Sequence, residues 1–133
     1  MVLEEVYENQ RGGGFGGKNK FTVGGLFSTE RGPWSNVHGQ HSLEKDFIDV
    51  PNKSWKWVNE WRIDHSGDVD EEGWEYAMGW RREFGSECHR NSFVRRRRWV
   101  RLRHKFRVRR GRDAIGLECL AHFFLLADRR RWH

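Results

Sequence analysis

Apolar and polar residues alternate in three parts of the chain, and this alternation predicts three β-strands. Trp and Ile occupy every second position through most of residues 55–63, and Trp, Tyr and Met do so in residues 74–80. In residues 95–109, Val, Leu and Phe on one parity alternate with Arg and Lys on the other. Successive side chains of a strand point to opposite faces, so each segment has one face suited to burial. Three such strands joined by polar turns indicate an all-β fold.

Weaker strand signals precede these segments. Residues 4–11 are typical of a short strand, and residues 21–29 of two strand pieces interrupted by a pair of glycines. The glycine cluster at 12–17 predicts a turn or loop, and the polar residues 36–53 predict a long surface loop. The predicted fold is therefore a single antiparallel β-sheet or sandwich with long loops.

Residues 114–127 break the alternation and are apolar enough to form a helix, with Asp113 as a suitable N-cap. Flanking arginines and Trp132 suit a helix that lies in a membrane interface, but packing on the sheet or binding a partner protein fits as well. A helix of this length spans about 21 Å, too short for a bilayer core of about 30 Å. We therefore divide the chain into a β domain, residues 1–110, and a C-terminal tail, residues 111–133, that can form an amphipathic helix.

Composition indicates what the core is made of. The chain has 133 residues, the usual size of one domain, and 36% of them are hydrophobic while 33% are charged. Eight Trp and nine Phe set the chain apart from disordered proteins, which are poor in aromatic residues, and predict an aromatic core. The sequence has no run of 18 apolar residues and no signal peptide, and two Cys suit a reducing compartment, so we expect a cytoplasmic location.

The charge of the chain is divided between two parts. Residues 1–87 hold 10 Lys+Arg against 16 Asp+Glu, whereas residues 88–133 hold 15 against 3. Pairing of the acidic with the basic part explains this division, and so does a basic surface for nucleic acid or anionic membrane. Guanidinium planes stack on Trp and Tyr rings, which allows a row of arginines to share one strand face. We expect a structural stack formed by Trp55, Trp57, Trp61, Trp74, Arg95, Arg97, Trp99 and Arg101.

Several motifs that resemble functional sites lack residues that the chemistry needs. The run Arg95–Arg98 splits between two strand faces, and helix-turn-helix, zinc-finger and RNA-binding signatures are missing, so we expect no nucleic acid partner. Gly12–Gly17 has dinucleotide-loop spacing, but no helix start follows it. Asp68–Gly73 resembles half of an EF-hand loop, but Gly79 stands where the bidentate Glu belongs. The cysteines form no C-x-x-C pair and no nucleophile elbow is present, so we expect no metal, cofactor, small-molecule substrate or enzymatic activity.

Five motifs in order resemble the dysferlin (DysF) domain over residues 4–108. They are YENQR at 7–11, RGPWS at 31–35, WKW at 55–57 with WRID at 61–64, GWEYA at 73–77, and NSFVRRRRWVR at 91–101. The resemblance implies a β-rich domain held together by arginine–aromatic stacks. It also implies a membrane setting, because the family occurs in ferlins, in a tectonin-repeat autophagy protein, in fungal peroxisomal membrane peroxins and in a short fungal sporulation protein. This short chain is most similar to the sporulation and peroxin types.

Residues 81–92, a polar connection between two predicted strands, are the candidate lipid-binding site. In related domains this connection carries an aromatic residue just before Asn-Ser and contacts lipid in some members, but Arg90 takes that position here. The connection has one aromatic residue and several basic ones, which favours anionic headgroups over apolar insertion. The candidate lipid-binding residues are Phe84, Arg81, Arg82, His89 and Arg90.

These features together predict a non-enzymatic peripheral membrane adaptor. We expect it to bind anionic phospholipid on the cytoplasmic surface of an intracellular membrane, of the forespore or ER–peroxisome type, and to help organise that membrane. The alternative is a protein–protein interaction module, in which the sheet or residues 114–127 dock a larger membrane-associated partner. In that case lipid contact is incidental to docking.

Overall fold

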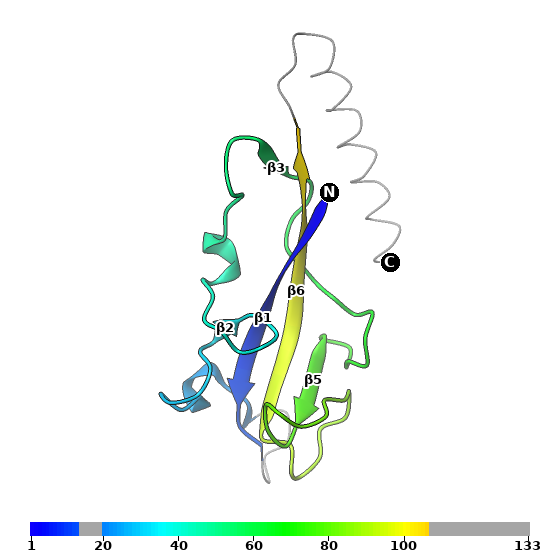
Figure 1. Ribbon diagram of the computed structural model, residues 1–133. Helices are drawn as coiled ribbons and strands as arrows, with labels where there is room; N and C mark the ends of the chain where they lie inside the picture. The colour runs from blue at the N-terminus through cyan, green and yellow to red at the C-terminus, as the bar shows by residue number, and fades with distance from the viewer. Residues whose placement is uncertain (14–19, 107–133) are drawn as a thin grey trace.

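Two long strands, β1 (Val2–Arg11) and β6 (Val94–Lys105), lie side by side along the middle of the sheet (Figure 1). The structure is a computed structural model that describes residues 1–13 and 20–106. β1 and β6 pair antiparallel along the whole of β1, from Val2 opposite Arg103 to Arg11 opposite Val94. The two ends of the described chain therefore form one ribbon.

β6 is the central strand, because three short strands pair with its second edge one after another. β3 (Trp55–Trp57), β4 (Arg62–Ile63) and β5 (Trp74–Ala77) all run antiparallel to β6, and β5 pairs nearest its start. On the opposite side, β2 (Trp34–Ser35) pairs with β1. The strands form one antiparallel sheet, with β2-β1-β6-β3 as its main order, which confirms the predicted all-β class.

The predicted continuous strand over residues 55–63 is wrong, because the chain leaves the sheet between β3 and β4. Val58 still donates its N–H to the Leu102 carbonyl at 2.9 Å. The Leu102 N–H, however, donates to the side-chain Oδ1 of Asn59 at 3.0 Å. A side-chain oxygen that replaces a backbone carbonyl interrupts the regular ladder, so pairing resumes only at Arg62.

The predicted strand pieces at 21–29 are also wrong. Only Thr22 forms a bridge, with Arg11, and the chain then turns into the 3-10 helix η2 (Val23–Gly25). The Gly25 N–H donates to Oγ1 of Thr22 at 3.0 Å, which stabilises the turn over an extended conformation.

Other element boundaries differ from the expected ones by a few residues. β5 ends at Ala77, before the expected residue 80, and β1 begins at Val2, before the expected residue 4. The 36–53 loop contains the short 3-10 helix η3 (Lys45–Phe47) and an isolated bridge from His41 to Ser35, and its remaining residues are irregular, as predicted. The predicted helix at 114–127 and the domain boundary at 110 lie outside the described residues.

The aliphatic core of the sheet is small. Val6, Val94 and Val100 are among the largest fully buried side chains, together with the polar Asn9 and Ser35. Phe21, Trp74 and Tyr76 form a buried aromatic cluster, in which the rings of Phe21 and Tyr76 meet edge to face with centroids 5.5 Å apart. The rest of the sheet surface is covered by long side chains that are only partly apolar.

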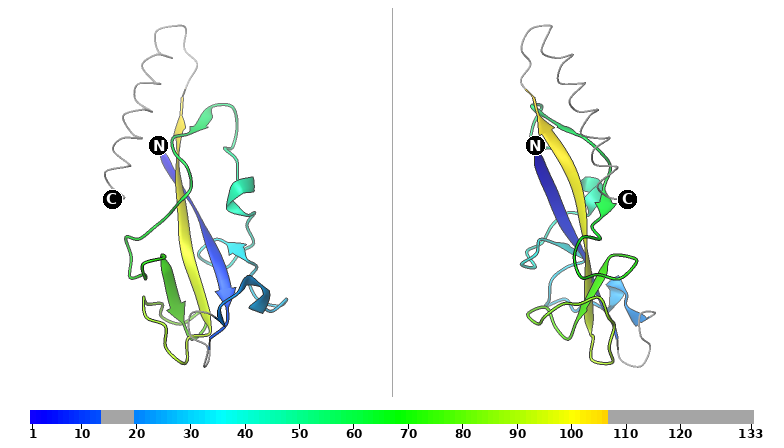
Figure 2. Two further views of the ribbon diagram at one scale, coloured as in Figure 1. Left: turned by 180° about the vertical axis from the view of Figure 1, so that it is seen from behind. Right: turned by 90° about the vertical axis from the view of Figure 1, so that its right-hand side faces the viewer.

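Several loops lie at one end of the sheet, while the connection that contains η3 runs along its length (Figure 2). The chain around η2 and the connection from β5 to β6 lie where β1 ends and β6 begins (Figures 1 and 2). The N-terminus and the end of β6 lie toward the opposite end (Figure 1). We call the first of these the loop end of the sheet.

Candidate functional site

A stack of aromatic rings and guanidinium groups covers one face of the sheet. Arg97 lies 4.4 Å from the Trp74 ring centroid and 5.2 Å from that of Trp99. The Arg95 guanidinium also contacts Trp74, 3.9 Å from the ring centroid, and it lies 5.1 Å from the centroid of Phe21. Rings and cations thus alternate, which is favourable because a ring face attracts a cation.

The same face continues toward the far end of β6 with two more ring contacts. Arg101 lies 4.3 Å from the Trp57 centroid, and Arg103 lies 3.8 Å from that of Trp55. Trp61 packs on Trp57, with the ring centroids 5.7 Å apart. The structure therefore places all eight residues of the predicted stack in ring contacts on or beside β6.

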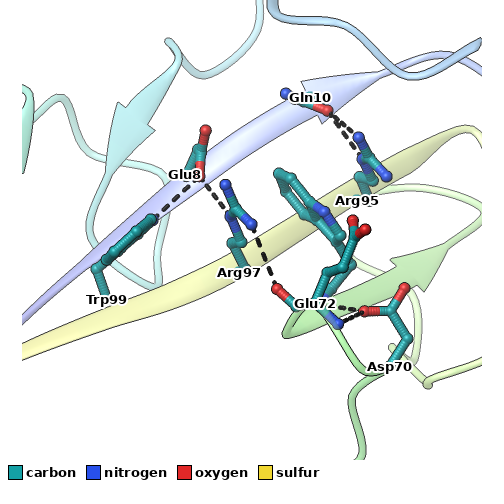
Figure 3. A network of polar contacts seen from close by, with 8 residues as sticks. Glu8, Gln10, Asp70, Glu72, Arg95, Arg97 and Trp99 are labelled. Atoms are coloured by element: carbon teal, nitrogen blue, oxygen red, sulfur yellow. Dashed lines mark hydrogen bonds and ion pairs between the residues drawn. The ribbon is translucent and has the colours of Figure 1, made fainter. Parts of the chain in front are cut away.

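Polar partners from β1 fix the guanidinium groups of this stack (Figure 3). Glu8 accepts from Nε of Arg97 at 2.6 Å and from Nε1 of Trp99 at 3.0 Å. Arg97 also donates to the Glu72 carbonyl at 3.3 Å, and Arg95 donates from Nε to the Gln10 side chain at 2.8 Å (Figure 3). The other ion pairs of β6 are Arg96–Glu75, Arg98–Glu5, Arg98–Asp64, Arg101–Glu60 and Arg103–Glu4.

These ion pairs determine how much of the positive charge of β6 is exposed to solvent. The ion-paired arginine side chains of β6 are only 13–30% exposed, so the strand offers no basic stripe to solvent. Their partners come largely from the acidic first part of the chain. Residues 107–133, which the structure does not describe, hold seven Arg and three Asp+Glu. Much of the net charge of +6 therefore comes from this segment.

The opposite face has a smaller stack, which includes the predicted lipid contact Phe84. Arg96 lies 3.9 Å from the Phe84 centroid and 4.9 Å from that of Tyr7. Arg31 lies 4.4 Å from the Trp80 centroid. Gly39, with φ +85°, allows this packing, because a Cβ there would lie 2.9 Å from the Arg31 guanidinium carbon. Phe84 is consequently half-buried, and its role in lipid binding stays a prediction.

The other predicted lipid-binding residues lie on the surface of the loop end. Arg81, Arg82, His89 and Arg90 are all exposed. Arg82, Phe84 and His89 line one open hollow of about 610 Å³, while Arg81 and Arg90 lie outside its lining. The loop is not purely basic, because Glu83 and Glu87 are exposed beside them, and these two also line the hollow.

Glu30 is a structural centre of the loop end that the sequence analysis missed. Its carboxylate accepts both Nε and Nη2 of Arg11 at 2.7 Å, the Phe27 N–H at 2.6 Å and Nε1 of Trp80 at 2.7 Å. Burial by itself raises the pKa of this carboxyl, but the hydrogen bonds from Arg11, Phe27 and Trp80 outweigh burial and lower the pKa to about 2. Glu30 thereby ties β1 to the chain after η2 and to the connection after β5.

Asn9 and Asp70 are two further structural centres. The Asn9 amide, fully buried, donates to the Gly32 carbonyl at 3.0 Å and to Ser35 Oγ at 2.8 Å, which joins the YENQR motif to RGPWS. Asp70 accepts the Trp74 N–H and the Tyr76 hydroxyl, both at 2.8 Å. Burial, with the hydrogen bond to Asp70, raises the pKa of Tyr76. The acidic segment 68–73 therefore shapes a turn, and no metal-binding group of three ligands occurs in residues 1–13 and 20–106.

Comparison with known proteins connects the chain with a family of membrane proteins. Residues 1–101 match the Pex24p family, described as integral peroxisomal membrane peroxin. Within the described residues, no helix is long and apolar enough to cross a bilayer. The family connects the chain with membranes and with proteins that are not enzymes in kind.

Individual relatives agree with this assignment. The meiotically up-regulated gene 65 protein of Schizosaccharomyces pombe is 39% identical over 112 residues, which are 81% of this chain and 45% of that protein. Tectonin beta-propeller repeat-containing protein 1 of Mus musculus is 37% identical over 75% of the chain, and the Drosophila melanogaster protein is 34% identical over 77%, each over 8% of the relative. The chain thus spans less than half the length of these relatives. It belongs to the Pex24p family, and the resemblance to DysF domains is confirmed.

Proposed function

We propose that this chain is a non-enzymatic peripheral adaptor that binds anionic phospholipid on the cytoplasmic side of an intracellular membrane and helps to organise that membrane. The observation that supports this most is one of exposure: the ion-paired arginines of β6 are only 13–30% exposed, whereas Arg81, Arg82 and Arg90 are exposed in the connection between β5 and β6. The family description favours a peroxisomal membrane, and the name of the Schizosaccharomyces pombe relative suits a role in meiotic cells.

The geometry favours a weak, salt-sensitive contact. Each basic residue near an anionic surface contributes about 1 kcal/mol, and Glu83 and Glu87 offset part of this attraction. The Debye length is about 8 Å at physiological salt, so the contact is strongest for side chains at the surface itself. The contact of Phe84 with Arg96 fixes this connection to β6. Residues 107–133 add further positive charge to the complex.

Vesicle flotation tests this proposal. We expect the full chain to float with vesicles of phosphatidylcholine and phosphatidylserine, and to float poorly with phosphatidylcholine alone or at high salt. The double variant Arg81→Glu/Arg90→Glu should float less, because it reverses two charges at the loop end. Lys53→Glu/Lys56→Glu reverses two charges on exposed residues before and within β3, and serves as the matched control. Equal recovery on neutral and anionic vesicles at both salt concentrations would contradict the proposal.

A deletion of residues 112–133 separates the two sources of charge. If the loop end binds the membrane and the tail only adds positive charge, the shortened chain keeps its preference for anionic vesicles with lower overall recovery. If the preference disappears with the deletion while the fold stays intact by circular dichroism, the proposed site is wrong. This variant also tests whether the tail is a docking element, since partner recovery should then fall with it.

The first half of β1, Val2–Val6, favours the second candidate function, a protein-docking module. β2 covers β1 only at Tyr7 and Glu8, so among the described residues no strand pairs with the outer edge of Val2–Val6. Met1, Val2 and Leu3 are exposed there. An uncovered strand edge can accept a strand from a partner, through backbone hydrogen bonds.

The direction of the backbone groups provides a sharp test of this second candidate. Asn9 and Arg11 donate their N–H groups to the outer side of β1, so by alternation Leu3 also points outward while Glu4 points to β6. Leu3→Pro should therefore keep the fold and abolish recovery of a partner from solubilised membranes. Glu4→Pro, the control, should destabilise the sheet. Unchanged partner recovery with Leu3→Pro would exclude strand addition at this edge.

A further inference from the structure

Four exposed apolar side chains lie around the loop end of the sheet. Val23 is 51% exposed, Phe27 62%, Met78 48% and Phe93 39%. We call these four residues the apolar rim. Phe84, the aromatic residue of the neighbouring connection, is half-buried instead, because its ring packs on Arg96. The most accessible apolar groups of the loop end are therefore outside residues 81–92.

Backbone hydrogen bonds bring the members of the rim to the same edge. Phe93 donates its N–H to the Ala77 carbonyl at 3.0 Å, which places Phe93 beside Met78. Gly12 donates to the Phe93 carbonyl at 3.0 Å, and Arg11 exchanges two hydrogen bonds with Thr22, the residue before Val23. Thr22, Arg11, Val94 and Ala77 thus form one row across the end of the sheet, and Val23, Phe93 and Met78 each follow or precede a member of this row.

Phe27 is held at the edge by Arg11 and Glu30. The Arg11 guanidinium lies 4.5 Å from the Phe27 centroid, and the Glu30 carboxylate accepts the Phe27 N–H at 2.6 Å. The same carboxylate binds Trp80, in the connection that begins after β5. The chain after η2 and the connection after β5 are therefore fixed to each other. The protein then loses little conformational freedom when both segments contact the same surface.

The charges around the rim suit a membrane interface. Lys20, Arg81, Arg82 and Arg90 are exposed at this end, with the acidic Glu83 and Glu87 among them. Apolar side chains bordered by basic ones are typical of surfaces that sit at the boundary of headgroups and acyl chains. The first residues of β1 and the last residues of β6 lie toward the opposite end of the sheet (Figure 1).

We propose that the apolar rim inserts into the interfacial layer of the bilayer, with the long axis of the β1–β6 ribbon directed at the membrane and the loop end foremost. This inference rests on the proposed function and specifies how the surface binds. The basic residues bring the loop end to an anionic surface, and the rim then supplies an apolar contact that salt does not screen. Binding accordingly has a salt-sensitive and a salt-resistant part.

Two pairs of exposed apolar residues permit a matched test. Phe27→Ser/Phe93→Ser removes two rings from the rim, and Leu43→Ser/Phe47→Ser removes two large apolar side chains of 57% and 71% exposure from around η3. Flotation with vesicles of phosphatidylcholine and phosphatidylserine is measured for the full chain in low salt and in high salt. We expect the rim variant to lose at least about tenfold in partition coefficient at both salt concentrations, because salt does not screen an apolar contact, and the η3 variant to match the unaltered chain.

The outcomes separate this inference from the proposed function. If the unaltered chain binds anionic vesicles and the rim variant binds equally well, the rim does not insert and only the inference fails. If the unaltered chain binds no vesicle, both fail. If the η3 variant loses as much as the rim variant, the ribbon lies flat on the membrane, which also overturns the inference.

A fluorescence measurement reports directly whether the loop end enters the bilayer. Cys88 and Cys119 are changed to Ser, and a single Cys is introduced either as Met78→Cys or as Phe47→Cys and labelled with a polarity-sensitive dye. Vesicles should shift the emission of the label at 78 to the blue and leave that at 47 unchanged. Equal shifts at both positions, or no shift at 78 under conditions where the protein floats, would overturn the proposed orientation.

Discussion

Arginine has two different roles in two neighbouring regions of this molecule. On β6, Arg97 is flanked by two indole rings and paired with Glu8, and it is held on the sheet. In the connection between β5 and β6, Arg81 and Arg82 are exposed. The residue type is the same, but the neighbours differ: rings and acids in fixed register on the strand, and solvent at the loop. A net charge of +6 therefore overstates the basic surface, because most of the cations on β6 have internal acidic partners.

Removal of the ring at the centre of the stack should have the largest effect on the strand side of this comparison. Trp74 is 3% exposed and lies between Arg95 and Arg97. Trp74→Ala should lower the free energy of unfolding by about 3–5 kcal/mol, because it removes a buried ring and leaves two guanidinium groups without a ring between them. Urea denaturation measures this change. A loss below 1 kcal/mol would show that the stack does not stabilise the sheet.

Removal of one cation should have a smaller but still clear effect. Arg97→Ala should cost about 2–4 kcal/mol, since it leaves the partly buried Glu8 carboxylate without its guanidinium partner. Arg82→Ala, at an exposed loop position, should change the stability by less than about 0.5 kcal/mol. Similar melting temperatures for the two variants would remove the distinction between strand and loop arginines.

The pH dependence of the free energy of unfolding should show how much the Glu30 carboxylate stabilises the fold. The folded pKa of about 2 lies below the ordinary value of 4.5, so the stabilisation is complete above about pH 4.5 and is lost as the pH falls from there toward 2. The loss amounts to about 2–3 kcal/mol. Glu30→Gln should remove this pH dependence from the unfolding free energy while it lowers stability at neutral pH. A parallel decline in both proteins between pH 4.5 and 2 would contradict the assignment.

The smallest expected effect concerns a loop arginine and appears only in binding. Arg81→Gln should leave urea denaturation unchanged and weaken binding to anionic vesicles about fivefold, the equivalent of about 1 kcal/mol. The effect should shrink as salt is added. A destabilised Arg81→Gln would indicate that this side chain belongs to the scaffold instead.

Much of the fold follows from alternation and composition. The parity of β6 puts Arg95, Arg97 and Arg101 on one face, and the rings of β3 and β5 are on strands that pair with β6. An aromatic core was the remaining choice for a chain so poor in aliphatic residues. Those two arguments account for the all-β class and for the choice of residues in the stack.

The missed features depend on side chains that bind backbone or loops over long distances. Asn59 ends β3 through an oxygen that accepts from Leu102, 43 residues further along, and polarity patterns do not record this bond. Glu30 belongs to no pattern that the sequence analysis used, yet its carboxylate accepts a hydrogen bond from Trp80, 50 residues away. The same limit applies to the rim, because exposure of Met78 and Phe93 follows from where β5 stops and β6 starts.

The pairing of β1 with β6 also has a consequence for how the chain is made. Glu4 finds its partner Arg103 across 99 residues, so during translation the first strand emerges long before the strand that will hold it. Closure of so distant a contact is slow compared with local folding. We therefore expect the sheet to close only after nearly all of β6 has left the ribosome, and the nascent polypeptide to need protection from aggregation for that interval.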